Sequence, residues 1–332
     1  MASERATAKV ESTPVTTATL QSLGAWTLDE LLQEPPPPNY LVEGLIEAGK
    51  VTDIFGAPNE GKTTITTNLT VSIAAGCSSW FGLRIASGRV VMLGGEVSDL
   101  ATAQRQMQRL RRQVKGLDDA ERDRLAILPC ADPIWRYDEN VGWDLTDYGR
   151  RLTDAIAKWE PILVVIDTMT GAANFGRGGA DLVSVQYQLG KAVIHWARDT
   201  RTTVITISHT NQSSAKADVC DRLNFLSRTG TNGWPAAMRS MAGVTRLHTD
   251  EARALGYKKS VTAFGISKNP EHPTPPVWTD KAPGLFTYSY EHGLLLARDG
   301  REIAANGGIE AMIEAGNKGD EKKGGVRVDP FG

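Results

Sequence analysis

Short aliphatic runs alternate along this chain with longer segments whose apolar residues follow a helical period. The runs predict strands. Because they are apolar throughout rather than at every second position, we expect both faces of each strand to be buried, as in a parallel sheet. The expected strands cover residues 51–55, 89–93, 125–128, 162–166 and 203–208. The helical period falls between them, over residues 63–75, 100–114, 146–159 and 182–198. This alternation predicts an α/β fold with a doubly wound, mostly parallel central sheet.

The pattern changes after residue 230, where further strands follow without long helices between them. Strands are expected over residues 261–267 and 285–290, and they predict an antiparallel extension that closes the sheet. A helix is expected just before them, around residues 234–241.

The two ends of the chain differ in composition from its middle. Residues 1–37 predict a flexible leader, with a short helix over residues 26–32 that Thr27 caps and a stiff proline spacer behind it. Residues 38–296 are expected to form the folded domain. Residues 297–332 predict a C-terminal helix and a polar, flexible tail.

Charge and cysteine content narrow the class of protein. The 37 Lys and Arg residues balance 39 Asp and Glu residues to a net charge of −2, so any site for a polyanion must be local. The longest aliphatic run, residues 162–166, is far too short to span a membrane, and the N-terminus lacks the apolar stretch of a secretion signal. The three scattered cysteines show neither a disulfide framework nor zinc-ligand spacing. We therefore expect a cytoplasmic protein without membrane contact.

Residues 56–63 read GAPNEGKT, a complete G-x-x-x-x-G-K-[ST] motif between an expected strand and an expected helix. In such a loop the backbone amides cradle phosphates, Lys62 would reach the β- and γ-phosphates, and the Thr63 hydroxyl would bind Mg²⁺. A chance match is the alternative, and the strand and helix around the motif argue against it. The predicted ATP site consists of Gly56, Ala57, Pro58, Asn59, Glu60, Gly61, Lys62, Thr63 and Thr64.

Three polar residues stand at the ends of other expected strands, where α/β folds bind their ligands. Asp167 would hold the metal together with Thr63, or else cap the following helix. Glu96 would take a proton from the water that attacks the γ-phosphate, although by itself it would be an exposed acid. His209 would sense the γ-phosphate, although a lone histidine is more often structural.

Four segments of the chain resemble the RecA-like hexameric ATPases, and specifically the RepA-like AAA ATPase family of plasmid replicative helicases. In chain order they are YLVEGLIEAGKVTDIFGAPNEGKTT, VVMLGGEVSD, ILVVIDTMTG and VITISHTNQ. The resemblance covers residues 38–290, and its most specific feature is Glu96 on the strand after the P-loop helix. It implies a RecA-like P-loop fold, assembly into a hexameric ring, and ATP sites between subunits. It also implies the roles given above for Lys62, Thr63, Glu96, Asp167 and His209.

The resemblance further implies a basic residue that reaches the γ-phosphate of a neighbouring subunit. The candidates are Arg228, Arg239 on the helix expected around residues 234–241, and Lys268 at the end of an expected strand. Thr229 breaks the family's Arg-Gly-Ser-Ser pattern, so the choice among the three stays open. Each would neutralise transition-state charge only if another subunit presents it.

Single-stranded DNA is the partner that the resemblance implies. Residues 104–115 are cationic, and they predict either a DNA-binding helix or an ordinary solvated face. The Gly-rich residues 171–180 would grip a single strand, and residues 210–223 would move with His209. The tip, residues 326–332, resembles the acidic-Pro-Phe ends of single-strand-binding proteins, so it would dock on a replication partner or form an ordinary disordered end.

Three functions are compatible with these observations. The first is an ATP-driven ring motor on single-stranded DNA, a replicative helicase. The second is a RecA or phage annealing-type recombinase ATPase, which the leader disfavours because it lacks an apolar-aromatic strand for linking subunits. The third is a nucleotide-switched assembly or regulatory protein without DNA, which the net charge of −2 keeps open.

Overall fold

The computed structural model describes residues 25–37, 39–81, 83–94, 99–111, 114, 117, 123–129, 132–174, 182–210, 219–224, 233–254, 261–268, 285–291 and 294–298. The chain divides into two units, Met1–Pro38 and Asn39–Gly332. In the first unit, α2 (Leu28–Leu31) begins at Thr27, whose hydroxyl accepts a hydrogen bond from the Glu30 amide while the Glu30 carboxylate accepts one from the Thr27 amide. This reciprocal capping confirms the short helix that the sequence predicts.

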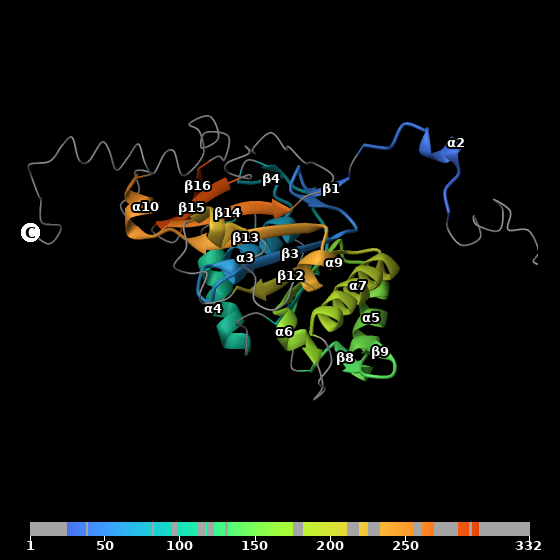
Figure 1. Cartoon of the computed structure of the whole chain (residues 1–332). Helices are drawn as coiled ribbons and strands as arrows, with labels where there is room; N and C mark the ends of the chain where they lie inside the picture. The colour runs from blue at the N-terminus through green and yellow to red at the C-terminus, as the bar shows by residue number, and fades with distance from the viewer. Residues whose placement is uncertain are drawn as a thin grey trace, which may run out of the picture. The chain divides into compact units, whose positions relative to one another are not determined.

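The second unit is built on a nine-stranded sheet, counted over the described residues, in the order β16-β15-β14-β13-β3-β12-β10-β6-β7 (Figure 1). The strands from β7 to β13 are parallel, and β14, β15 and β16 continue the sheet in antiparallel pairs. The α/β fold with a mostly parallel central sheet and an antiparallel extension is therefore confirmed. The strands are β3 (Val51–Gly56), β6 (Val90–Gly94), β7 (Leu125–Leu128), β10 (Leu163–Asp167), β12 (Thr203–His209), β13 (Ser240–Arg246), β14 (Val261–Lys268), β15 (Leu285–Glu291) and β16 (Leu294–Arg298).

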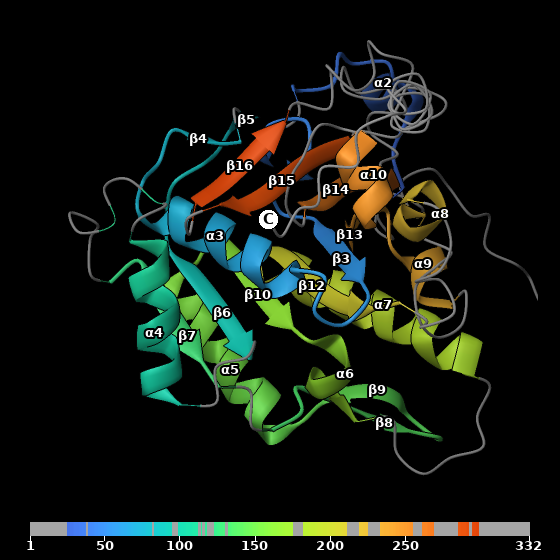
Figure 2. The same ribbon diagram turned by 90° about the vertical axis from the view of Figure 1, so that its left-hand side faces the viewer.

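Helices cover both faces of this sheet, and Figure 2 views it from the α3 side. On that face Ile65 and Leu69 of α3 pack on Ile54 and other strand residues. The opposite face packs on α5, α7 and α9 through residues such as Leu189 and Trp234. Within the described ranges, no helix is long and apolar enough to cross a bilayer. The helices of this unit are α3 (Lys62–Ala74), α4 (Leu100–Leu110), α5 (Asp147–Trp159), α6 (Met169–Ala172), α7 (Leu182–Thr200), α8 (Val219–Leu223), α9 (Gly233–Ala237) and α10 (Thr249–Ala254).

The helix expected around residues 234–241 is wrong in its second half. The helix α9 ends at Ala237, and β13 begins at Ser240 and runs parallel to β3. Alanine and methionine favour helix locally, but the middle of β13 is fully buried between β3 and β14, and that packing outweighs the local preference.

A small sheet, formed by two strands between β7 and α5 and one short strand after α6, was not expected from the sequence. It consists of β8 (Trp135–Asp138), β9 (Gly142–Leu145) and β11 (Ala173–Asn174), in the order β11-β8-β9. The indole of Trp143 donates a hydrogen bond of 2.8 Å to the Val185 carbonyl and so ties the hairpin to α7. The remaining short strands, β1 (Tyr40–Val42) with β2 (Ile46–Glu47) and β4 (Ser79–Trp80) with β5 (Leu83–Arg84), form two further antiparallel pairs.

A charged residue lies inside the central sheet. Asp53, in the middle of β3, is completely buried, and it shares the sheet face of Val51 and Phe55 that packs on α7 and α9. Its two carboxylate oxygens accept hydrogen bonds from the Thr206 hydroxyl at 2.8 Å and the Ser208 hydroxyl at 2.7 Å, both on β12. These bonds join the strand before the P-loop to the strand that ends at His209.

We expect Asp53→Ala to lower the free energy of unfolding by about 3 kcal/mol, because it leaves two buried hydroxyls without their acceptor. Urea denaturation of the purified protein measures this change. The matched control is Asp123→Ala, since Asp123 is an exposed carboxylate 3.4 Å from Arg89, and its loss is expected to cost less than about 0.5 kcal/mol. Equal losses in the two variants would contradict the role given to Asp53.

Candidate nucleotide-binding site

The P-loop leaves the sheet between two neighbouring strands. On one side His209 of β12 is in register with Gly56, and the Thr210 amide donates a hydrogen bond of 3.1 Å to the Gly56 carbonyl. On the other side β13 approaches so closely that a Cβ atom at Gly56 would lie 2.2 Å from the Val244 carbonyl oxygen. Only glycine fits this position, so the first glycine of the motif is required by packing on β13.

The loop then turns into α3 through residues with left-handed backbone. Asn59 has φ 63° and Gly61 has φ 96°, and Gly61 is the N-cap of α3. Asparagine and glycine are the residues that adopt this conformation most readily. The turn brings the amides of the first helical turn to the end of the loop, which is the arrangement that binds phosphate in P-loop proteins.

Lys62 is folded back along the loop. Its side chain is buried, and its ammonium donates hydrogen bonds to the carbonyls of Gly56 at 2.9 Å and Ala57 at 2.7 Å. The cation is thus held inside the loop, where phosphate oxygens would compete for its protons. The neighbouring residues differ in exposure: Ala57 and Glu60 are half-buried, while Pro58, Asn59 and Thr64 are exposed.

A side-chain contact between Thr63 and Asp167 joins the P-loop helix to the end of β10. The Thr63 hydroxyl donates a hydrogen bond of 2.6 Å to the Asp167 carboxylate. Asp167 is the last residue of β10, in register with Gly94 of β6 and Ile207 of β12. The helix-capping alternative is wrong, because Thr168 is the N-cap of α6.

The pair Thr63 and Asp167 fits a magnesium ion. A hydroxyl and a carboxylate in contact supply the oxygen donors that Mg²⁺ prefers, and the carboxylate can also hold water ligands of the ion. Thr63 and Asp167 would hold the ion, which would supply positive charge beside the phosphates of a bound ATP. The contact seen between the two side chains fixes both of them at the mouth of the P-loop.

Two of the residues singled out from the sequence, Glu96 and Arg228, lie outside the described residues. The strand that leads toward Glu96 is described as far as Gly94, which lies beside Asp167. His209 is described and half-buried, next to the first residue of the P-loop. In the described part of the site, five residues thus lie together at the carboxyl ends of the parallel strands: Gly56, Lys62, Thr63, Asp167 and His209.

Arg239 and Lys268 lie at the other end of these strands, near the amino ends of β3 and β13. Arg239 is exposed just before β13, whose first residue Ser240 is in register with Thr52, and Lys268 pairs with Met241. Thr52 and Gly56 are separated along β3 by about 13 Å at the usual rise per residue. The backbone of neither residue therefore lies beside the P-loop of its own chain, and the action of the two residues on a neighbour stays a prediction.

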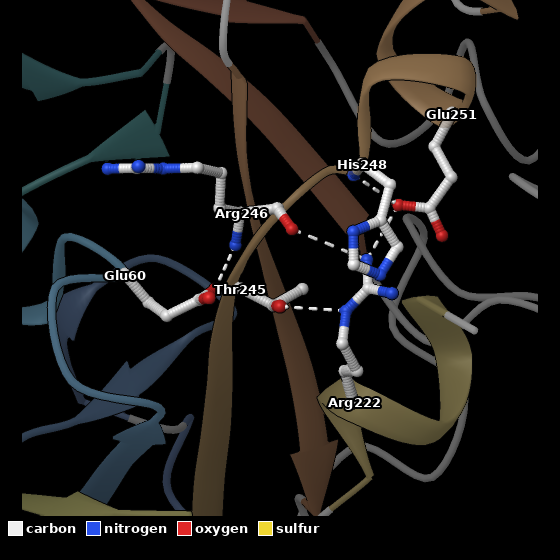
Figure 3. A network of polar contacts seen from close by, with 6 residues as sticks. All are labelled: Glu60, Arg222, Thr245, Arg246, His248 and Glu251. Carbon is white, nitrogen blue, oxygen red and sulfur yellow. Dashed lines mark hydrogen bonds and ion pairs between the residues drawn. The ribbon is translucent and has the colours of Figure 1, made fainter. Parts of the chain in front are cut away.

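One arginine that was not among the residues predicted from the sequence, Arg246, lies beside this P-loop. Arg246 ends β13, its guanidinium donates a hydrogen bond of 3.2 Å to the Asn59 carbonyl, and its amide donates one to the Glu60 carboxylate (Figure 3). No motif marks Arg246. Only the parallel pairing of β13 with β3 brings it to the loop.

A strand carrying a P-loop, a buried helix behind it and an acidic residue two strands away define the class: a P-loop nucleotide-binding protein. The comparison with known families agrees. The AAA domain family, AAA_25, matches residues 16–215, more than half of the chain, and the chain therefore belongs to this family.

No curated protein matches the chain. Among solved structures, the chain is similar to a KaiC-like protein from the hyperthermophilic archaeon Pyrococcus horikoshii OT3, with 11% identity and a TM-score of 0.49, over 80% of this chain and 100% of that one.

We expect Gly56→Ala to abolish ATP binding and to lower the melting temperature, because the added Cβ would force β13 away from the loop. Fluorescence titration with an ATP analogue and a thermal melt measure the two effects. Gly171→Ala is the control for folding, since nothing lies within 4 Å of a Cβ at Gly171. Normal ATP binding by Gly56→Ala would show that β13 does not constrain the P-loop.

Proposed function

We propose that this chain is an ATP-hydrolysing ring motor that acts on single-stranded DNA, of the RepA-like helicase kind. The observation that carries the ATPase part is the 2.6 Å contact between Thr63 and Asp167 at the mouth of the P-loop. It supports binding of ATP with Mg²⁺ because it unites the two side chains that the metal needs.

Hydrolysis is assigned to residues around this contact. Glu96, two residues beyond Gly94, is the proposed general base for the attacking water. His209, in register with Gly56, is the proposed sensor of the γ-phosphate. The alignment of Gly94, Asp167 and His209 at one edge of the sheet supports both roles, since groups from β6, β10 and β12 would then surround one phosphate.

Two features support a nucleic-acid partner. The outer side of α4 exposes Arg105 and Arg109, and Arg111 just beyond its end is exposed as well, so the described part of the cationic segment is open to solvent. The short elements α6 and β11 lead directly from Asp167 into the Gly-rich residues 171–180, of which residues 171–174 are described. A movement of Asp167 on hydrolysis would thus displace the proposed DNA-gripping segment, which follows it within a few residues.

The ring itself is proposed from the position of the basic residues. Arg239 and Lys268 stand at the sheet edge away from their own P-loop, where a neighbouring subunit would meet them. Together with Arg228 they remain the candidates for the residue that acts in trans. A hexamer follows from the family resemblance.

Docking of a replication or single-strand-binding protein on the tail is a further proposal, and residues 299–332 lie outside the described part.

The deciding experiment measures ATP hydrolysis, strand displacement and strand annealing together, with and without single-stranded DNA. We expect DNA to stimulate hydrolysis, and the specific activity to rise with protein concentration because assembly completes the site. Lys62→Ala is expected to lose ATP binding, whereas Glu96→Gln is expected to bind ATP and hydrolyse it about 10²-fold more slowly.

The outcomes separate the alternatives. Annealing without displacement would favour a recombinase, and hydrolysis indifferent to DNA would favour a nucleotide-switched assembly protein. Mixing Lys62→Ala with a variant of Arg228, Arg239 or Lys268 should restore activity only where the missing cation acts in trans. A rate per protein chain that does not depend on protein concentration would overturn the ring.

A further inference from the structure

A continuous chain of polar contacts runs from the P-loop through the end of β13 to α8 and α10 (Figure 3). At the P-loop end, Arg246 makes two contacts with successive loop residues. Its backbone amide donates a hydrogen bond to the Glu60 carboxylate, and its guanidinium donates one of 3.2 Å to the Asn59 carbonyl. Both loop residues immediately precede the Gly-Lys-Thr that meets the phosphates.

The other side of Arg246 is anchored in the protein interior. Arg222 of α8 donates to the Arg246 carbonyl at 3.4 Å, to the Thr245 hydroxyl at 3.0 Å and to the Glu251 carboxylate at 2.6 Å. The side chains of Arg222 and Glu251 are only 4% and 9% exposed. A buried pair with this many partners is rigid, because breaking it would leave a charge without compensation in the interior.

Glu251 is itself fixed by the helix that carries it. Its carboxylate accepts a hydrogen bond of 2.7 Å from the His248 amide just before α10. Figure 3 shows Arg222 and Glu251 on one side of β13 and the Arg246 guanidinium on the other, the side of Glu60. The backbone of Arg246 therefore connects the buried Arg222–Glu251 pair to Glu60 in the P-loop.

A carboxylate in a phosphate-binding loop is unfavourable unless it is held away from the phosphates, because like charges repel. The Arg246 backbone amide holds the Glu60 carboxylate through a hydrogen bond. The Arg246 guanidinium binds the carbonyl of Asn59, which has the left-handed φ of 63° that shapes the turn. A loop held in this shape before ATP arrives loses less conformational entropy on binding.

We propose that Arg246 is a positioning residue that clamps Asn59 and Glu60, and that the Arg222–Glu251 pair holds the clamp in place. The clamp rests on the proposed function, since its purpose is to prepare the P-loop for a nucleoside triphosphate. The clamp residues Arg246, Arg222 and Glu251 lie beyond residues 16–215, the part that matches the AAA domain family.

The test uses the half-buried Glu60 and the exposed Arg246 rather than the buried Arg222 and Glu251, so that folding is preserved. Glu60→Ala, Glu60→Gln, Arg246→Ala, Arg246→Lys and the double variant Glu60→Ala/Arg246→Ala are compared in the full chain. Two readouts are taken: the Kd for a fluorescent ATP analogue with Mg²⁺, and the hydrogen exchange of the amides of residues 57–62 without nucleotide. The matched control is the exposed pair Glu43 and Arg84, joined by hydrogen bonds of 3.1 and 2.7 Å and changed to alanine in the same way.

We expect Glu60→Ala and Arg246→Ala each to raise the Kd about fivefold and to speed exchange of the loop amides by a similar factor. Glu60→Gln should stay within about twofold of the wild type, because its amide oxygen still accepts the bond. Arg246→Lys should lie between Arg246→Ala and the wild type. The double variant should lose less than the product of the two single losses, because Asn59 and Glu60 are successive residues of one loop and releasing either of them already loosens the other.

Separate measurement of KM and kcat for ATP hydrolysis distinguishes a loosened P-loop from partial unfolding of the protein. A clamp variant should raise the KM for ATP and leave kcat at saturating ATP within about twofold, because Lys62, Thr63 and Asp167 stay in place. Kd and exchange unchanged in Glu60→Ala and Arg246→Ala would overturn the clamp, as would equal effects in the Glu43 and Arg84 controls. If the wild type binds no ATP, the proposed function fails, and the exchange measurement still decides whether the clamp exists.

Discussion

The hydrogen bond between the Thr63 hydroxyl and the Asp167 carboxylate is the contact on which the whole site depends. It joins the first turn of α3 to the end of β10, a strand separated from β3 by β12. The contact forms only because β3, β12 and β10 are parallel and in one register, with Gly56 beside His209 and Asp167 beside Ile207. A slip of one residue would turn Asp167 to the opposite face of the sheet, away from α3.

Further contacts hold β3 in this register with its two neighbours in the sheet, β12 and β13. The buried Asp53 carboxylate ties β3 to β12 through Thr206 and Ser208. On the opposite side of β3, β13 packs against Gly56 and places Arg246 at the exposed part of the P-loop. The loop thus lies between two strands that hold it by different means, a hydrogen bond to its first carbonyl on one side and the Arg246 contacts on the other.

The fold and the center of the site could be predicted from the sequence because their signals are local. A strand buried on both faces is a short aliphatic run, and a P-loop is a contiguous motif. The segment of β13 could not be recognised, because its Ala-Met-rich start favours helix and only the burial between β3 and β14 makes it a strand. Asp53 was hidden within an otherwise apolar strand, and Arg246 is separated from Glu60 by 186 residues. Both acquire their roles from tertiary pairing alone.

The central claim is that Thr63 and Asp167 together hold Mg²⁺ with ATP at this P-loop. Calorimetric titration of ATP into the wild type and Asp167→Asn, each with Mg²⁺ and with EDTA, tests it most directly. The account predicts that Mg²⁺ tightens ATP binding by the wild type at least about tenfold and that Asp167→Asn loses most of this gain. An equal gain from Mg²⁺ in both proteins would contradict the claim.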